Sequence, residues 1–208
     1  TMNDKPGVHD LLWLKPSTDL SVAELPVWVS SVWNQHEPVI VRRDYKPDHI
    51  PVGIRGHERS QRHPFWITAS DIIRRLSPQD ITALVKTGQA QQKLAKFPAY
   101  RALDTLLQQR WDFEIGVTGS LAISVVSETI YVKESSDLDL TIRCNTPVEK
   151  SYFNHFYAFI NTLPVQVDVQ IETPSGGFSL SEWMKSPTVM LKTNCGPKLT
   201  TNPWGEEI

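Results

Sequence analysis

Cysteine is scarce in this chain, with two among 208 residues, Cys144 and Cys195. Two cysteines so far apart form neither a disulfide framework nor a CxxC metal site. The sequence also has no run of eighteen apolar residues and no apolar stretch near its start, so it predicts neither a membrane span nor a signal peptide. From these absences we expect a cytoplasmic protein that does not bind a membrane.

A strong excess of either charge is also missing. Lysine and arginine number 21, aspartate and glutamate number 23, and the formal net charge is -2. This balance excludes a uniformly basic nucleic-acid coat protein, and we expect no nucleic acid among the partners. Hydrophobic residues make up 40% of the chain and charged residues 21%, which is typical of a globular protein with one domain or two small ones.

The positive charge is concentrated in one segment. Between Arg42 and Arg62 six basic and three acidic residues give a local net charge of +3. The basic residues are Arg42, Arg43, Lys46, Arg55, Arg59 and Arg62. Such a segment is either a solvated surface turn or part of a binding site for an anionic ligand.

Residues 1–64 predict a small β-rich unit. The short apolar runs Leu11–Leu14, Val39–Val41 and Val52–Ile54 are bounded by proline, aspartate and histidine. This spacing of short runs and breakers is typical of strands joined by many turns.

Residues 65–208 predict a second unit, in which the pattern becomes helical from Trp66. Predicted helices cover residues 78–86, 99–110 and 146–163, and predicted strands cover residues 113–118, 137–143 and 165–172. Ser77-Pro78 and Thr146-Pro147 both have the cap residue and proline that start a helix. The last sixteen residues show no strong pattern. The predicted fold class is α/β (α+β), with a mixed sheet and flanking helices following the β-rich unit.

Three aspartates are the candidate catalytic and metal-binding residues. Asp137 and Asp139 are two residues apart on a predicted strand, so both side chains face one side. Asp168 lies on the polar face of the later strand, and the three carboxylates converge if the two strands are neighbours. Hard oxygen ligands of this kind suit Mg²⁺, and Mn²⁺ accepts the same ligands. Each aspartate alone is also typical of a solvated strand face, so the prediction depends on their combination.

Gly119-Ser120 is a candidate phosphate-binding turn. The dipeptide follows a predicted strand and precedes a short predicted helix. A glycine there lets backbone N–H groups approach a phosphate at the start of the helix. A plain turn is the alternative interpretation.

Taken together, these segments resemble the nucleotidyltransferase superfamily of the DNA polymerase β type. The motif of that superfamily is Gly-Ser, then two aspartates alternating with hydrophobic residues, then a third carboxylate on a later strand. Here Gly119-Ser120, Asp137-Leu138-Asp139-Leu140 and Asp168 match it. Sixteen residues separate Ser120 from Asp137, a longer gap than is usual in that superfamily.

A narrower resemblance covers most of the chain. It rests on His9–Leu14, Val39–Arg43, Val52–Gly56, Arg59–Arg62, Gly176–Trp183 and Leu191–Pro197. These segments are similar to the phosphoribosyl-dephospho-CoA transferase of malonate decarboxylase, also called malonate decarboxylase holo-acyl-carrier-protein synthase.

The resemblance implies a specific reaction and a specific partner. The family transfers the phosphoribosyl-dephospho-CoA group from its triphosphate donor, 2'-(5''-triphosphoribosyl)-3'-dephospho-CoA, to a serine of the apo acyl carrier protein, and releases pyrophosphate. A triphosphate requires cations, and guanidinium groups bind phosphate in a bidentate way, so Arg55, Arg59 and Arg62 are the candidate clamp. Asp168 is the candidate acceptor of the serine proton, and Gly119 and Ser120 are expected to hold the outgoing phosphates.

Two alternatives remain open at this point. The first is the equivalent transferase acting on the carrier protein of citrate lyase, which needs the same core motif. The second is a non-catalytic module of the same fold that binds a nucleotide or a partner protein. Three converging acids argue against the second alternative, because binding alone does not need them.

Overall fold

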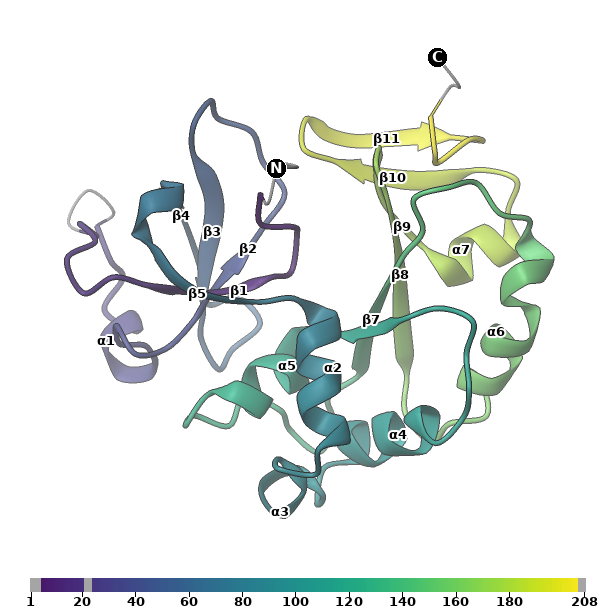
Figure 1. Cartoon of the computed structure of the whole chain (residues 1–208), viewed down its shortest axis with the longest axis horizontal. Helices are drawn as coiled ribbons and strands as arrows, with labels where there is room; N and C mark the ends of the chain where they lie inside the picture. The colour runs from purple at the N-terminus through teal and green to yellow at the C-terminus, as the bar shows by residue number, and fades with distance from the viewer. Residues whose placement is uncertain (1–4, 21–23, 206–208) are drawn as a thin grey trace.

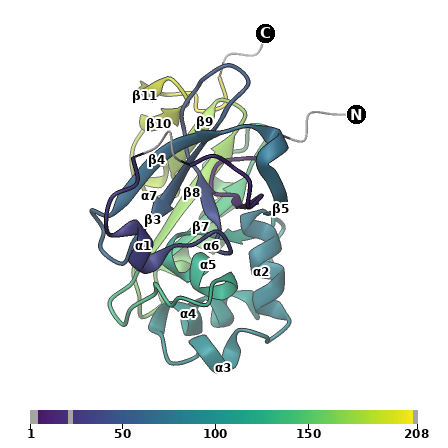
Figure 2. The ribbon, with the colours of Figure 1, turned by 90° about the vertical axis from the view of Figure 1, so that its left-hand side faces the viewer.

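Two β-sheets lie side by side in the chain, which a computed structural model describes at residues 5–20 and 24–205 (Figure 1). The first sheet has five strands in the order β4-β3-β2-β1-β5, and the second has six in the order β11-β10-β9-β8-β7-β6. Figure 2, viewed from the side of the first sheet, places that sheet in front of the second, with α3 and α4 below both. The chain therefore has the predicted α+β class.

The first sheet is antiparallel throughout. Its strands are β1 (Leu11–Leu14), β2 (Val39–Val41), β3 (Ile50–Arg55), β4 (Arg62–Ile67) and β5 (Ile72–Leu76). All four residues of β1 are buried, because Leu12 and Leu14 face a core within the first sheet's own half while Leu11 and Trp13 join the core of the second. A strand buried on both faces reads as a continuous apolar run rather than an alternation.

The second sheet is mixed. Its strands are β6 (Ile115–Val117), β7 (Leu138–Arg143), β8 (Val167–Thr173), β9 (Gly176–Ser179), β10 (Val189–Thr193) and β11 (Gly196–Thr200). Only β7 and β8 pair in parallel, and the other pairs are antiparallel. A parallel pair needs a crossover connection, which α6 supplies.

Most of the helices lie in the half of the second sheet, whereas the helix at residues 29–32 packs in the core of the first sheet. The helices are α1 (Val29–Val32), α2 (Pro78–Lys86), α3 (Gln91–Leu94), α4 (Pro98–Leu107), α5 (Gly119–Val126), α6 (Asn154–Ile160) and α7 (Leu180–Lys185), with short 3₁₀ turns at Ala69–Asp71 and Lys150–Phe153. The predicted start of α2 is confirmed, because Asp80 N donates to Ser77 Oγ at 3.1 Å and Ser77 N donates to the Asp80 carboxylate at 2.8 Å. No helix in the described residues is both long and apolar enough to cross a membrane.

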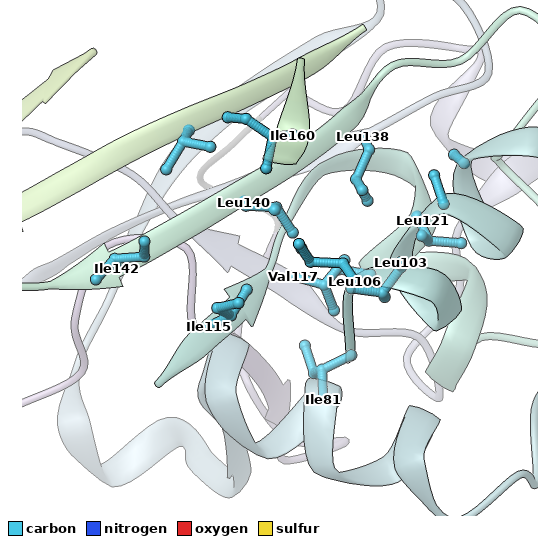
Figure 3. Packing of buried hydrophobic residues seen from close by; sticks show 14 of the residues in the cluster. Ile81, Leu103, Leu106, Ile115, Val117, Leu121, Leu138, Leu140, Ile142 and Ile160 are labelled. Atoms are coloured by element: carbon cyan, nitrogen blue, oxygen red, sulfur yellow. The ribbon is translucent and has the colours of Figure 1, made fainter. Parts of the chain in front are cut away.

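The larger core lies between the second sheet and helices α2, α4 and α5. Figure 3 shows Ile81, Leu103 and Leu106 from the helices directed at Val117 and Leu140 from the strands. All five side chains are at most 1% exposed. This packing fixes β6, α5 and β7 relative to one another and so determines where the candidate site residues at their ends lie.

Two local predictions are wrong, and one strand was not predicted. The segment after Trp66 is not helical but continues as β4 and β5, since β5 pairs with β1 and completes the first sheet. The predicted helix from Thr146 begins later, as a 3₁₀ turn followed by α6, and the Thr146 cap is not formed. The last sixteen residues include β11, which is mostly exposed and has no hydrophobic alternation that would predict a strand. The first sheet thus extends beyond residue 64, and the division of the chain into two domains stays a prediction.

A buried aspartate links the two halves. Asp10 is 0% exposed, and its carboxylate accepts hydrogen bonds from Gly7 N at 2.8 Å and Arg75 Nε at 2.6 Å. Its other oxygen lies 3.5 Å from Arg143 Nη2, at the end of β7 in the second sheet. Because a buried carboxylate is stable only when it is well paired, this network fixes the second sheet against the first.

Candidate active site

A cavity of about 740 Å³ opens between the two sheets. Side chains from β2, β3 and β4 form one wall, and side chains from β7, β8, β9 and β10 form the other. On β8 the polar residues Asp168 and Gln170 line the cavity, while Ile171 on the opposite face is buried in the core. Part of the polar face that the alternation of residues 165–172 predicted is therefore the floor of an open cavity, in which Asp168 is exposed.

Two of the three predicted acids lie side by side on this floor. Asp139 on β7 and Asp168 on β8 are paired in the parallel register, so their side chains emerge from neighbouring strands at the same level. Both line the cavity. Asp137 lies one residue before β7, is exposed and does not line the cavity, but its charge acts on Asp139.

The pKa of Asp139 is raised from 3.8 to about 6. Burial is the largest cause, the charge of Asp168 is the next, and Asp137 adds to the effect. Arg55 and Arg59 act in the opposite direction but do not cancel it. Asp139 is thus a carboxylate whose negative charge is only partly compensated by the protein.

The acid pair fits a hard divalent cation by its chemistry, because a cation between two adjacent carboxylates relieves the repulsion of their negative charges. The described residues contain no group of three or more His, Cys, Asp or Glu side chains that is already arranged to hold a metal ion. The three predicted ligands therefore do not form a closed cluster here. Binding of Mg²⁺ or Mn²⁺ stays a prediction.

Of the Gly119-Ser120 dipeptide, Gly119 lines the cavity and Ser120 does not. Gly119 lines the cavity with φ +69°, and a Cβ built on it would collide with Asp139 Oδ2. Ser120 is buried, does not line the cavity, and has its hydroxyl 3.5 Å from Ser136 Oγ. The long segment before Asp137 is held by Ser124, whose Oγ accepts from Tyr131 N at 2.9 Å. Phosphate contact by Gly119 and Ser120 stays a prediction, and only Gly119 has direct access.

Two of the three predicted arginines face the acids. Arg55 on β3 and Arg62 on β4 are directly opposite in register, and both line the cavity. Like charges in such a pair repel unless an anion lies between them. Arg59 is exposed at the hairpin tip and does not line the cavity, although its charge reaches Asp139 and Arg62.

The cationic wall has buried nitrogen atoms without hydrogen-bond partners. Among the described residues, Arg55 Nε and His63 Nε2 are buried without a hydrogen-bond partner, and both residues line the cavity. The pKa of Arg55 is lowered to about 10, mainly by burial and next by Arg62. A buried donor such as Arg55 Nε is unfavourable without a partner, and an anionic ligand satisfies it.

The far end of the cavity contains residues that were not predicted as site residues. His9, Arg43 and Lys192 line it, and Arg43 Nη2 forms an ion pair with Glu172 Oε1. Gly177 on β9 lies beneath that pair. Arg43 belongs to the basic segment between Arg42 and Arg62, but its contact with Glu172, 129 residues later, could not be read from the sequence.

The raised pKa of Asp139 predicts a pH-dependent stability. A carboxyl group whose pKa is higher in the folded protein than in the unfolded chain destabilises the fold once it ionises. Stability should therefore fall as pH rises from about 4 to above the folded pKa of about 6. A shift of this size amounts to roughly 3 kcal/mol, which solvent in the open cavity reduces to about 1–2 kcal/mol.

Asp139→Asn should remove this dependence. Without a divalent cation, the variant should be more stable than the parent by about 1–2 kcal/mol at pH 8 and equally stable near pH 4. Urea unfolding in EDTA between these pH values measures the difference. Asp104→Asn, an exposed aspartate on α4, should follow the parent at every pH. A difference between Asp139→Asn and the parent that does not change with pH would contradict the prediction.

An acid pair on parallel strands, which shares one cavity with the guanidinium groups of Arg55 and Arg62, is the arrangement expected of group-transfer enzymes that act on a phosphorylated donor. Two family models match the chain. The model described as the phosphoribosyl-dephospho-CoA transferase MdcG N-terminal domain matches residues 7–78, and the model of the MdcG C-terminal domain matches residues 83–203. The chain belongs to the phosphoribosyl-dephospho-CoA transferase (MdcG) family and is a transferase.

Curated relatives have the same name and nearly the same length. The phosphoribosyl-dephospho-CoA transferase of Klebsiella pneumoniae (strain 342) is 35% identical over 207 residues, which is 99% of this chain and 100% of the relative. That of Azotobacter vinelandii is 36% identical, covering 97% of this chain and 95% of the relative. That of Pseudomonas putida is 34% identical, covering 96% and 95%. No solved structure matches the chain.

Proposed function

We propose that this transferase attaches the phosphoribosyl-dephospho-CoA group to a serine of the apo acyl carrier protein of malonate decarboxylase. The donor is 2'-(5''-triphosphoribosyl)-3'-dephospho-CoA, and pyrophosphate leaves. One observation supports this most strongly: Asp139 and Asp168 share one register row and face the opposed pair Arg55 and Arg62 within one cavity. A triphosphate that reacts with a hydroxyl needs both walls, because its negative charge must be bound while the hydroxyl loses a proton.

In the proposed mechanism the protein supplies no nucleophile. The serine hydroxyl oxygen of the carrier attacks the α-phosphorus of the donor triphosphate, and the bond from this phosphorus to the pyrophosphate oxygen breaks. Asp168, which is exposed on the cavity floor, accepts the hydroxyl proton. Arg55 and Arg62 bind the phosphate oxygens on which charge accumulates as pyrophosphate leaves. The glycine at 119 leaves its backbone N–H accessible to the phosphates.

A divalent cation completes the proposal. Asp139 and Asp168, with Asp137 outside the cavity lining, are the residues that would hold it. When bound, it would neutralise phosphate charge. We also propose the cytoplasm as the compartment, which agrees with two free cysteines, Cys144 and Cys195.

The test is the intact mass of the apo carrier protein of malonate decarboxylase after incubation with this protein, the triphosphate donor and Mg²⁺. A gain of one phosphoribosyl-dephospho-CoA group is expected, together with one pyrophosphate per carrier in a coupled assay. EDTA should prevent both, and added Mg²⁺ should restore them. A gain that EDTA leaves unchanged would overturn the proposed cation.

The carrier itself is tested by competition. Apo carrier proteins of malonate decarboxylase and of citrate lyase, present in equal amounts, should compete for the enzyme, and the malonate decarboxylase carrier should be labelled faster. Faster labelling of the citrate lyase carrier would show that this carrier, and not that of malonate decarboxylase, is the acceptor. Labelling of neither carrier would overturn the proposed acceptor.

A further inference from the structure

The far end of the cavity is a second cationic site that the proposed mechanism does not use. His9, Arg43 and Lys192 line the cavity there. Lys192 is exposed, and its ammonium group has no hydrogen bond or ion pair with any described residue. The carboxylate of Glu172, also at this end, forms an ion pair with Arg43 and lies 3.8 Å from His9 Nε2. Arg43 and Lys192 therefore give this end an excess of positive charge over Glu172.

The register of the second sheet separates this end from the acid pair. Glu172 on β8 is opposite Gly177 on β9, which is opposite Lys192 on β10, so these residues form one row across three strands. Asp168 is four residues before Glu172 on β8, and a strand rises about 3.3 Å per residue, which puts the two rows roughly 13 Å apart. A phosphate bound at the acid pair cannot also be bound by Lys192.

The backbone at Gly177 and at His9 allows the side chains at this end of the cavity to come together. A Cβ at Gly177 would collide with Arg43 Nη2 and lie 2.6 Å from Glu172 Oε1, so only glycine lets Arg43 cross from the first sheet to the second. His9 has φ 71°, a left-handed conformation that is uncommon for histidine, and its N–H donates to Val41 O at 2.9 Å. Burial lowers the pKa of His9, with Arg43 and Lys192 adding to the effect and Glu172 opposing it.

We propose that the end formed by His9, Arg43 and Lys192 binds the diphosphate of the donor's dephospho-CoA half. This inference rests on the proposed function, which identifies the donor. That donor has a triphosphate and a diphosphate separated by two ribose rings, so it needs two separate cationic sites in one cavity. With the triphosphate between Arg55 and the acid pair, the nucleoside part lies along the cavity and the diphosphate reaches Arg43 and Lys192.

Binding of dephospho-CoA, which has the diphosphate but no triphosphate, tests this site without any transfer reaction. Lys192→Gln should weaken dephospho-CoA binding about five- to tenfold in isothermal titration calorimetry at low salt. Binding of adenosine, which has no phosphate, should not change. The matched control is Lys198→Gln on β11, since Lys198 is also exposed but does not line the cavity. It should bind dephospho-CoA like the parent.

Glu172→Gln should have the opposite effect. Removing the carboxylate that neutralises Arg43 leaves this guanidinium free for the ligand, so dephospho-CoA should bind about three- to fivefold more tightly. A purely structural role of the ion pair would not tighten binding. In the transfer assay, Lys192→Gln should raise the KM for the donor by about the same factor as it weakens dephospho-CoA binding and leave kcat nearly unchanged.

The outcomes separate the site from the function. Transfer by the parent together with unchanged dephospho-CoA binding in Lys192→Gln would overturn this site and leave the proposed function standing. Failure of transfer to either carrier, together with the expected changes in dephospho-CoA binding, would overturn the proposed function and leave a dephospho-CoA site. No binding of dephospho-CoA by the parent protein would overturn the site.

Discussion

Replacing Asp139 with alanine should reduce transfer to the carrier protein by about a thousandfold or more while the fold remains intact. Asp139 is the half-buried member of the acid pair, and Arg55 on the opposite wall and Arg59 at the hairpin tip act on its charge. Its removal would deprive the site of the carboxylate next to Asp168. The backbone would be retained, because the carbonyl of residue 139, which accepts from Thr118 N at 2.9 Å, is present in alanine as well.

The rate is best measured under single-turnover conditions, by the mass gain of the carrier protein. Circular dichroism and thermal unfolding show whether the variant is folded. Asp104→Ala on α4 is the control for loss of one exposed carboxylate and should transfer normally. Near-normal transfer by a folded Asp139→Ala protein would remove Asp139 from the catalytic residues. Asp137→Ala should also lose transfer. Asp137 does not line the cavity, so this variant tests whether an acid outside the cavity lining is needed for transfer.

Gly119→Ala should reduce transfer by about a hundredfold, although it adds only one methyl group. The residue has φ +69°, where alanine costs about 1 kcal/mol relative to glycine. The new Cβ would also collide with Asp139 Oδ2, so the carboxylate must move out of its row with Asp168. A displacement of about 1 Å at a reacting group is enough for a loss of this size.

A second glycine separates these two effects. Gly88 has φ +79°, and a Cβ there would meet only Gln91 Oε1, at 4.0 Å. Gly88→Ala should therefore lose stability like Gly119→Ala but retain normal transfer. The two variants are compared by urea unfolding and by the single-turnover rate. Equal transfer by both would show that the closeness of Gly119 to Asp139 is unimportant for catalysis.

Much of the fold followed from local sequence signals. The apolar runs at Leu11–Leu14 and Val39–Val41 form strands, and the Ser77 cap starts α2 as predicted. The alternation before Glu172 forms β8 with its polar face in the cavity. These elements depend on periodicity and caps, which adjacent residues determine.

The two strands that were not predicted, β5 and β11, have a common physical cause. The segment Ile72–Leu76 has no strand alternation and becomes a strand only because it pairs with β1. Gly196–Thr200 is stabilised as a strand by its ladder with β10, and four of its five residues are exposed. Where pairing with a distant strand supplies the hydrogen bonds, the local pattern of apolar residues carries little information.

By itself, the sequence determined the residue types of the site: carboxylates on two strands, a glycine before a helix, and a basic segment. It also indicated the family that the comparisons confirmed. The tertiary structure alone decided which of these residues meet. The parallel pairing of β7 with β8 aligned Asp139 with Asp168, and Asp137 fell outside the strand. The packing of one sheet against the other put Arg55 opposite the acids and Arg43 beside Glu172. These contacts join residues far apart in the chain, and they depend on strand order and sheet packing, which no local pattern encodes.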